Sequence, residues 1–236
     1  MPIRWLFFDV GDVLFDEDVP HLYYYHSMLL AMRRNGIDVA WDDYHLRIED
    51  YSRVSPGSSI LDAARYYVPD DALWEKVSKE GRAEYEEMRR PRPYGLLMDN
   101  IAPVLRVLRR DYRMGVVANQ HPPVLKALDD YGIGPLFDLK LIDQVVGVSK
   151  PDPAIFKLAL SEAGCAAGEA IMTGDRPDND IAPARSVGMW TIRFKRGVLY
   201  TAYDPRTDLE HAHLVVTEPA RLPAAVAELA ARAASA

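Results

Sequence analysis

Several short polar segments of the chain stand just beyond apolar runs that have the length of buried strands. The side chains in these segments that could react or bind are Asp9, Asn119, Lys150, Asp175 and Asp180. A carboxylate can attack phosphorus and form an aspartyl-phosphate, which divides one difficult displacement into two easier ones. The set therefore suits phosphoryl transfer, with Asp9 as the nucleophile, provided that the fold brings the segments together.

A nucleophilic carboxylate and a phosphate repel each other, so the site needs positive charge. Mg²⁺ prefers hard oxygen ligands, often one or two carboxylates together with the substrate phosphate. Asp9, Asp175 and the backbone carbonyl of Gly11 are the candidate metal ligands, and Asp180 suits a catalytic role beside the metal through a water molecule. Lys150 would place a positive charge on the transferring phosphoryl group and pair with Asp9 at rest.

Other groups of the same segments could bind the substrate phosphate. The backbone N–H groups of the turn at Gly11 and Asp12 could hold its oxygens. Lys150 could contact it directly. The side-chain amide of Asn119 could donate a hydrogen bond to it, although a purely structural role of Asn119 in the turn is an equal alternative.

The elements that must position these residues alternate between strand and helix from about residue 94 onward. The expected strands are 3–8, 114–118, 139–142, 170–173, 190–194 and 214–216. Such alternation predicts a mostly parallel sheet with helices on both faces. Folds of this kind place their sites beyond the carboxyl ends of the strands, where the polar segments stand.

Residues 20–90 have a different texture and predict an all-helical segment. The expected helices are 21–34, 41–51, 59–67 and one that begins at Asp70 or Asp71 and reaches Arg90. The segment 91–93 (Pro-Arg-Pro) cannot continue a helix and is interpreted as a linker. The helical segment therefore interrupts the α/β part of the chain.

The polar segments, in this order, resemble the motifs of the haloacid dehalogenase-like (HAD) superfamily. Residues 7–14 fit its first motif, an apolar strand followed by the nucleophilic Asp. Residues 150–153 fit the third, a Lys followed by Pro-Asp-Pro, and 174–180 fit the fourth, Gly-Asp followed by a second Asp. Residues 116–119 fit the second motif, except that they lack the Ser or Thr hydroxyl with which it normally ends. The resemblance covers most of the chain.

This resemblance implies an α/β fold with a Rossmann-like, mostly parallel sheet and an inserted all-α cap domain. Residues 1–16 and 93–236 would form the catalytic core, and 17–92 a helical cap of the C1 type, which selects the substrate. It also implies a Mg²⁺-dependent hydrolase, most simply a phosphatase of a small phosphorylated metabolite that forms an aspartyl-phosphate on Asp9.

Two positions depart from the family pattern. Gly11 stands where many phosphatases of the superfamily carry the Asp that protonates the leaving group, a function worth roughly 10²–10⁴ in rate. Ala118 stands where the second motif normally has Ser or Thr, which removes a hydrogen bond to phosphate. Asp16 and His121 are candidate replacements for the missing acid. The departures leave two alternatives open: a non-catalytic HAD-like binding protein, and a hydrolytic dehalogenase that uses Asp9.

The composition and net charge of the chain argue against some classes of binding partner. The chain has 236 residues, a net charge of −7 and one cysteine, Cys165. It has no run of Lys or Arg that would follow a nucleic-acid backbone, so nucleic acid is not expected as a partner. The first apolar run is too short for a signal peptide or a membrane helix, so we expect a cytoplasmic protein without membrane association. The oligomeric state is open.

Overall fold

The computed structural model describes residues 1–55, 57–90, 94–199 and 201–235. These residues form two compact units. The core unit comprises Met1–Asp16, Leu96–Arg196 and Pro205–Ala236, and the helical unit comprises Glu17–Gly95 and Gly197–Asp204. The predicted linker at 91–93, and with it the predicted boundary between 92 and 93, lies outside the described residues.

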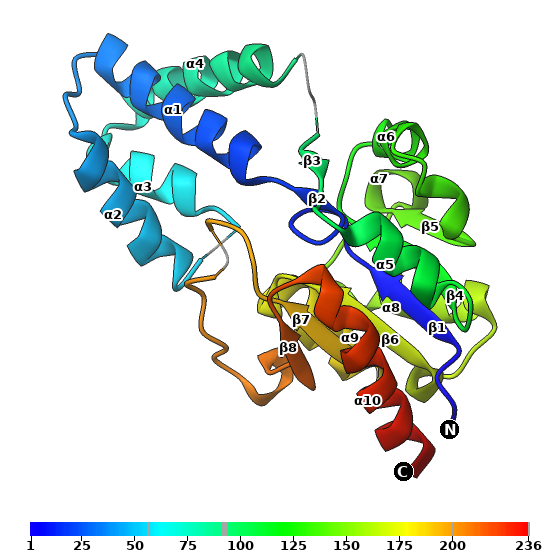
Figure 1. The fold of residues 1–236 in the computed structure, drawn as a ribbon. Coiled ribbons are helices and arrows are strands. Elements are labelled where there is room, and N and C mark those ends of the chain that lie inside the picture. The colour runs from blue at the N-terminus through cyan, green and yellow to red at the C-terminus, as the bar shows by residue number, and fades with distance from the viewer. Residues whose placement is uncertain (56, 91–93, 200, 236) are drawn as a thin grey trace. The chain divides into compact units, whose positions relative to one another are not determined.

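The core unit is built on a six-stranded parallel sheet with the order β5-β4-β1-β6-β7-β8 (Figure 1). Its strands are β1 (Trp5–Phe8), β4 (Arg113–Ala118), β5 (Leu139–Ile142), β6 (Ala170–Gly174), β7 (Trp190–Phe194) and β8 (Leu214–Val216). Every predicted strand is present within two residues of its expected bounds. The α/β fold with a mostly parallel sheet is therefore confirmed.

Helices cover the sheet because its central strand is apolar on both faces. All four residues of β1 are buried. Trp5 and Phe7 point to one face, where they join a hydrophobic cluster with α8 (Pro153–Ala163) and α9 (Ala182–Ser186). Successive side chains of a strand point to opposite faces, so Phe8 lies on the other face, with its ring 6.1 Å from that of Phe137.

The core unit also contains shorter strands and further α-helices. They are the antiparallel pair β2 (Phe15–Asp16) and β3 (Leu96–Leu97) and the helices α5 (Ile101–Leu108), α6 (Val124–Asp130), α7 (Asp143–Val146) and α10 (Leu222–Ser235). The segment directly before α9 forms a π-helical turn, Pro177–Ile181. Turns of this kind occur often at functional sites.

The helical unit contains α1 (Asp18–Arg34), α2 (Trp41–Ser52), α3 (Ser59–Tyr67) and α4 (Asp71–Arg89). Gly81 of α4 allows this helix to pack closely against α1. A Cβ at this position would overlap the side chain of Met28 on α1. The carboxylate of Asp70 accepts a 2.8 Å hydrogen bond from the N–H of Leu73 and caps α4. No helix in the described parts of the chain is both long and apolar enough to cross a membrane.

A segment from the C-terminal half of the chain belongs to the helical unit. The sequence assigned residues 197–204 to the core, but the structure groups them with the helices. Leu199 is 3% exposed and joins the hydrophobic cluster of α1, α2 and α3. The N–H of Val198 donates a 2.9 Å hydrogen bond to the carboxylate of Asp18. The helical unit is therefore built from two separate stretches of sequence.

Candidate active site

The polar segments meet at one end of the sheet because their strands are neighbours. Strand β1 lies between β4 and β6, so Asp9, Asn119 and Asp175 follow three adjacent strand ends. The N–H of Asp9 donates a 2.9 Å hydrogen bond to the carbonyl of Thr173, which extends the pairing of β1 with β6 to the nucleophile itself. The position of Asp9 is thus fixed by the sheet.

Three carboxylates converge at this end of the sheet. Oxygens of Asp9, Asp175 and Asp180 all lie within 4.8 Å of one another. The three residues are only 9%, 2% and 0% exposed, respectively. Buried carboxylates at this spacing match the hard oxygen ligands of Mg²⁺. We call these three residues the acidic cluster.

Lys150 joins the acidic cluster from the loop before α8. Its ammonium Nζ lies 2.7 Å from Oδ1 of Asp9 and 2.6 Å from Oδ1 of Asp180. The side chain is 1% exposed. The pairing with Asp9 that the sequence predicted is present, and the second bond, to Asp180, holds the ammonium between two carboxylates.

The charges of the site are not balanced by Lys150 alone. Burial, with the negative charge of Asp180, raises the pKa of Asp9 to about 6, although Lys150 opposes the increase. Burial also raises the pKa of Asp175 well above its usual range, and the charges of Asp180, Asp9 and Asp12 add to this. For Lys150, burial lowers the pKa, but Asp180 and Asp9 outweigh it and the pKa is raised. The cluster is therefore an environment that favours an additional cation.

Asp180 is held in place from two sides. Its Oδ2 accepts a 3.0 Å hydrogen bond from the N–H of Arg176, while its Oδ1 accepts from Lys150. Gly174 permits this approach, because a Cβ there would overlap the Asp180 side chain. The glycine before Asp175 is thus a structural requirement of the site, and a Gly-Asp pair at a strand end is the sequence signal for it.

Sequence reasoning missed Arg193 on β7. It is 4% exposed, and its Nε donates a 3.4 Å hydrogen bond to the backbone carbonyl of Asp175. A buried arginine is rare unless it is paired. The signal that could have found it is a charged residue inside an otherwise apolar strand. Arg193 supports the segment that carries Asp175.

The turn after Asp9 brings Gly11 and Asp12 to the same end of β1. The N–H groups of Leu14 and Phe15 both donate to the carbonyl of Val10, which closes the turn. Asp12 has a φ of 52°, in the left-handed region, and is 2% exposed. Its side chain is buried, and its negative charge acts on Asp175.

Asn119 makes two hydrogen bonds to the backbone of a single residue, Lys150. Its Nδ2 donates to the Lys150 carbonyl at 2.7 Å, and its Oδ1 accepts from the Lys150 N–H at 2.8 Å. Ala118, immediately before it, is fully buried at the end of β4. The structure thus places Asn119 beside the site, with one of its amide hydrogens engaged by protein.

The two candidate replacements for the missing acid have other partners. The carboxylate of Asp16 lies 3.2 Å from the guanidinium of Arg196. The exposed His121 has Nδ1 3.0 Å from Oε1 of Gln144. In this structure, neither residue belongs to the acidic cluster.

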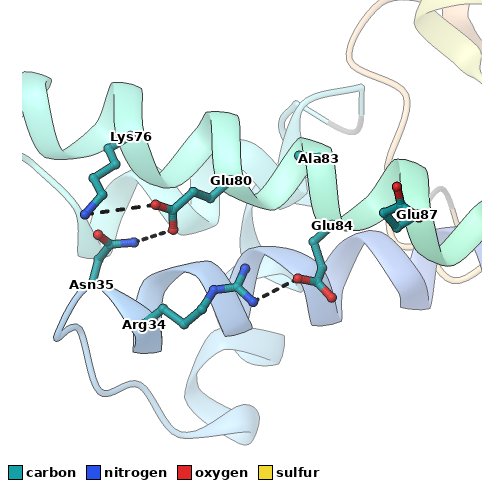
Figure 2. A pocket seen from close by; sticks show the side chains of 7 residues that line it. All are labelled: Arg34, Asn35, Lys76, Glu80, Ala83, Glu84 and Glu87. Atoms are coloured by element: carbon teal, nitrogen blue, oxygen red, sulfur yellow. Dashed lines mark hydrogen bonds and ion pairs between the residues drawn. The ribbon is translucent and has the colours of Figure 1, made fainter.

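The helical unit has hollows of its own. One, of about 220 Å³, is lined by residues that include His21, Tyr24 and Tyr85. Another, of about 530 Å³, runs along α1 and α4 (Figure 2). Its charged side chains bond to one another: Arg34 pairs with Glu84 at 2.8 Å, and Glu80 accepts from Asn35 at 2.8 Å. These bonds connect the C-terminal end of α1 with α4, so the second hollow belongs to the packing of these two helices.

A family model described as haloacid dehalogenase-like hydrolase matches residues 3–188, which contain the whole site. The chain belongs to the haloacid dehalogenase-like hydrolases. The predicted HAD resemblance and the prediction of a hydrolase are therefore confirmed. Within the family, the chain is 30% identical over 206 residues to a glyceraldehyde 3-phosphate phosphatase of Pyrococcus abyssi, an alignment that covers 83% of this chain and 82% of the relative.

Two further HAD proteins are similar over different extents. A phosphoserine phosphatase of Thermus thermophilus is 33% identical over 125 residues, which span 52% of this chain and only 49% of the relative. A HAD hydrolase of Bacillus subtilis, whose crystal structure is bound to magnesium, has a TM-score of 0.68 at 17% identity, and the match covers 96% of this chain and 99% of that one. At that identity the likeness shows the shared fold alone.

Proposed function

We propose that the protein is a Mg²⁺-dependent phosphatase of a small phosphorylated metabolite, with Asp9 as the nucleophile. The observation that carries the proposal is the acidic cluster with Lys150 bonded between Asp9 and Asp180. The phosphatase names of relatives from Pyrococcus abyssi and Thermus thermophilus support the same reaction class.

The residues present fit a magnesium ion. Burial raises the pKa of Asp9 and of Asp175, and the neighbouring carboxylates add to both increases, so a cation at this position would favour their ionised forms. Carboxylate oxygens of both residues and the carbonyl of Gly11 would hold the ion, and Asp180 would act through a water molecule. When bound, the ion would supply the positive charge that lets two negative groups approach each other.

The residues of the chain account for both steps of the reaction. An oxygen of Asp9 attacks phosphorus, the bond from phosphorus to the alcohol oxygen breaks, and the alcohol takes a proton from water. Water then attacks phosphorus, which releases phosphate and restores the carboxylate of Asp9. Lys150, held by Asp180, offsets negative charge on the phosphoryl group in both steps. Good leaving groups react best, because Gly11 cannot provide a proton.

A second candidate is a non-catalytic relative that binds a phosphorylated ligand, and Gly11 and Ala118 favour it. Against it, Asp9, Lys150 and Asp180 retain their mutual bonds. A hydrolytic dehalogenase would also use Asp9, but its chemistry needs no metal, so the acidic cluster argues for phosphoryl transfer.

Hydrolysis of p-nitrophenyl phosphate, with Mg²⁺ and with a chelator, tests the proposal. The leaving group is good, so the missing acid should matter little. We expect release that requires Mg²⁺ and is lost in Asp9→Asn. The matched control is Asp130→Asn, the same substitution at an exposed residue that pairs with Lys126.

The alternatives give different results. Mg²⁺-independent release of halide from a 2-haloacid by the wild type, lost in Asp9→Asn, would support the dehalogenase. Binding of phosphate with Mg²⁺, without turnover of any phosphate ester, would support the non-catalytic protein.

A further inference from the structure

We infer that Asn119 is a positioning residue that fixes the backbone of Lys150 and thereby aims its ammonium at Asp9 and Asp180. One side-chain amide satisfies both backbone polar groups of Lys150, the N–H at 2.8 Å and the carbonyl at 2.7 Å. The same residue then places Nζ 2.7 Å from Asp9 and 2.6 Å from Asp180. The two pairs of contacts lie at opposite ends of Lys150.

The location of Lys150 explains why its backbone needs hydrogen-bond partners from a side chain. Asp9 and Asp175 follow strands of the sheet, whereas Lys150 lies in the loop between α7 and α8, outside any strand. Backbone N–H and C=O groups away from water need partners, and strands obtain them from the sheet. Asn119 directly follows β4, so its amide gives Lys150 the partners that a neighbouring strand would otherwise provide.

The chemistry of the two side chains fits this division of tasks. A carboxamide carries a donor and an acceptor in one plane and can match the N–H and C=O of one residue, which neither a carboxylate nor an alkyl group can do. Lysine has a flexible four-carbon stem, so its ammonium is precise only where the backbone and the tip are both held. Asn119 holds the backbone, and the two carboxylates hold the tip.

Asn119 is itself exposed, so its truncation leaves the hydrophobic core intact. The test uses Asn119→Ala with Gln120→Ala as the matched control. Gln120 follows Asn119 and bonds to Asp143 through its backbone N–H at 2.8 Å, a contact that truncation of its side chain preserves. The first readout is acetylation of Lys150 by a limiting amount of acetic anhydride, quantified by mass spectrometry relative to the exposed Lys126.

We expect Asn119→Ala to increase acetylation of Lys150 about threefold or more. An increase of this size corresponds to the loss of at least one ordinary hydrogen bond. The second readout is kinetic and rests on the proposed phosphatase function. A displaced Lys150 should lower kcat for p-nitrophenyl phosphate about 10- to 100-fold and leave KM within about twofold. Gln120→Ala should match the wild type in both readouts.

The outcomes separate the alternatives. Unchanged labelling in Asn119→Ala would overturn the inference, and a raised KM with unchanged labelling would identify Asn119 as a direct phosphate ligand. If the wild type hydrolyses no phosphate ester, the proposed function fails, but the labelling still decides the role of Asn119 because it requires no substrate.

Discussion

Replacing Asp9 by asparagine should stabilise the metal-free protein above neutral pH, even though we expect it to abolish turnover. Asp9 is buried, and its pKa is raised from the ordinary 3.8 to about 6. At 1.36 kcal/mol per pKa unit, this difference corresponds to about 3 kcal/mol. Between these two values the folded state binds more protons than the unfolded state, so Asp9 makes the protein less stable as pH rises. Asparagine has no such titration.

The assay is urea unfolding of the wild type and Asp9→Asn in a chelator at several pH values. Taking the difference in unfolding free energy between the two proteins cancels the contribution of other titrating groups, which both proteins share. We expect the unfolding free energy of Asp9→Asn, relative to the wild type, to increase by about 1–2 kcal/mol between pH 5 and pH 8. A further increase of about 1 kcal/mol separates pH 4 from pH 5.

Magnesium provides the control, because it should reduce the difference in stability between the two proteins. A ligand that binds only the folded state stabilises it by about 2.7 kcal/mol at 100 times its Kd. Asp9→Asn lacks one proposed Mg²⁺ ligand, so Mg²⁺ should increase its unfolding free energy less than that of the wild type. A stability difference between the two proteins that does not change with pH in the chelator would contradict this expectation, because it would show that the pKa of Asp9 is not raised by folding.

Further substitutions test other parts of the site. Gly11→Asp should raise kcat for an alkyl phosphate about 100-fold, but change that for p-nitrophenyl phosphate only slightly, because only the poor leaving group needs an acid. Lys150→Met leaves buried carboxylates uncompensated and should lower the unfolding free energy by about 3–5 kcal/mol in urea titrations above pH 7. Gly174→Ala should displace Asp180 and lower kcat by at least about 100-fold with a folded circular dichroism spectrum. Leu199→Ala should cost about 2–5 kcal/mol and lower the melting temperature in calorimetry.

Each of these has a result that would contradict it. Equal effects of Gly11→Asp on both esters would show that proton donation is not what the position lacks. A fully stable Lys150→Met would mean that the carboxylates are protonated in the native protein. A fully active Gly174→Ala, or a Leu199→Ala with wild-type stability, would show that these close contacts are unimportant.

The strands could be predicted because each is a short apolar run bounded by polar or turn residues, a local pattern. Their meeting at one end of the sheet also followed, since parallel strands connected by helices present their carboxyl ends together. The convergence of Asp9 and Asp175 is therefore the part of the site that the sequence predicted best, although the chemical roles of these residues remain predictions.

Other features depend on contacts between distant residues and have no local signal. The amide of Asn119 bonds to Lys150, 31 residues away, and nothing in either segment indicates the pairing. Leu199 packs among the helices of the helical unit, although the stretches before residue 197 and after residue 204 belong to the core unit. The π-helical turn at Pro177–Ile181 has the composition of an ordinary helix start, and the π geometry places the Asp180 side chain within reach of Lys150 and the N–H of Arg176. Tertiary contacts override local preference at such places.

The central claim is that Asp9 becomes covalently phosphorylated, and chemical trapping tests it most directly. The protein is mixed with p-nitrophenyl phosphate and Mg²⁺, quenched within the first turnovers and treated with borohydride, which reduces an aspartyl-phosphate to homoserine. Mass spectrometry of the peptide that contains residues 3–8 and Asp9 then reports the modification. We expect homoserine at position 9 in the wild type and not in Asp9→Asn. Turnover without homoserine at position 9, or with the modification at another carboxylate, would contradict it.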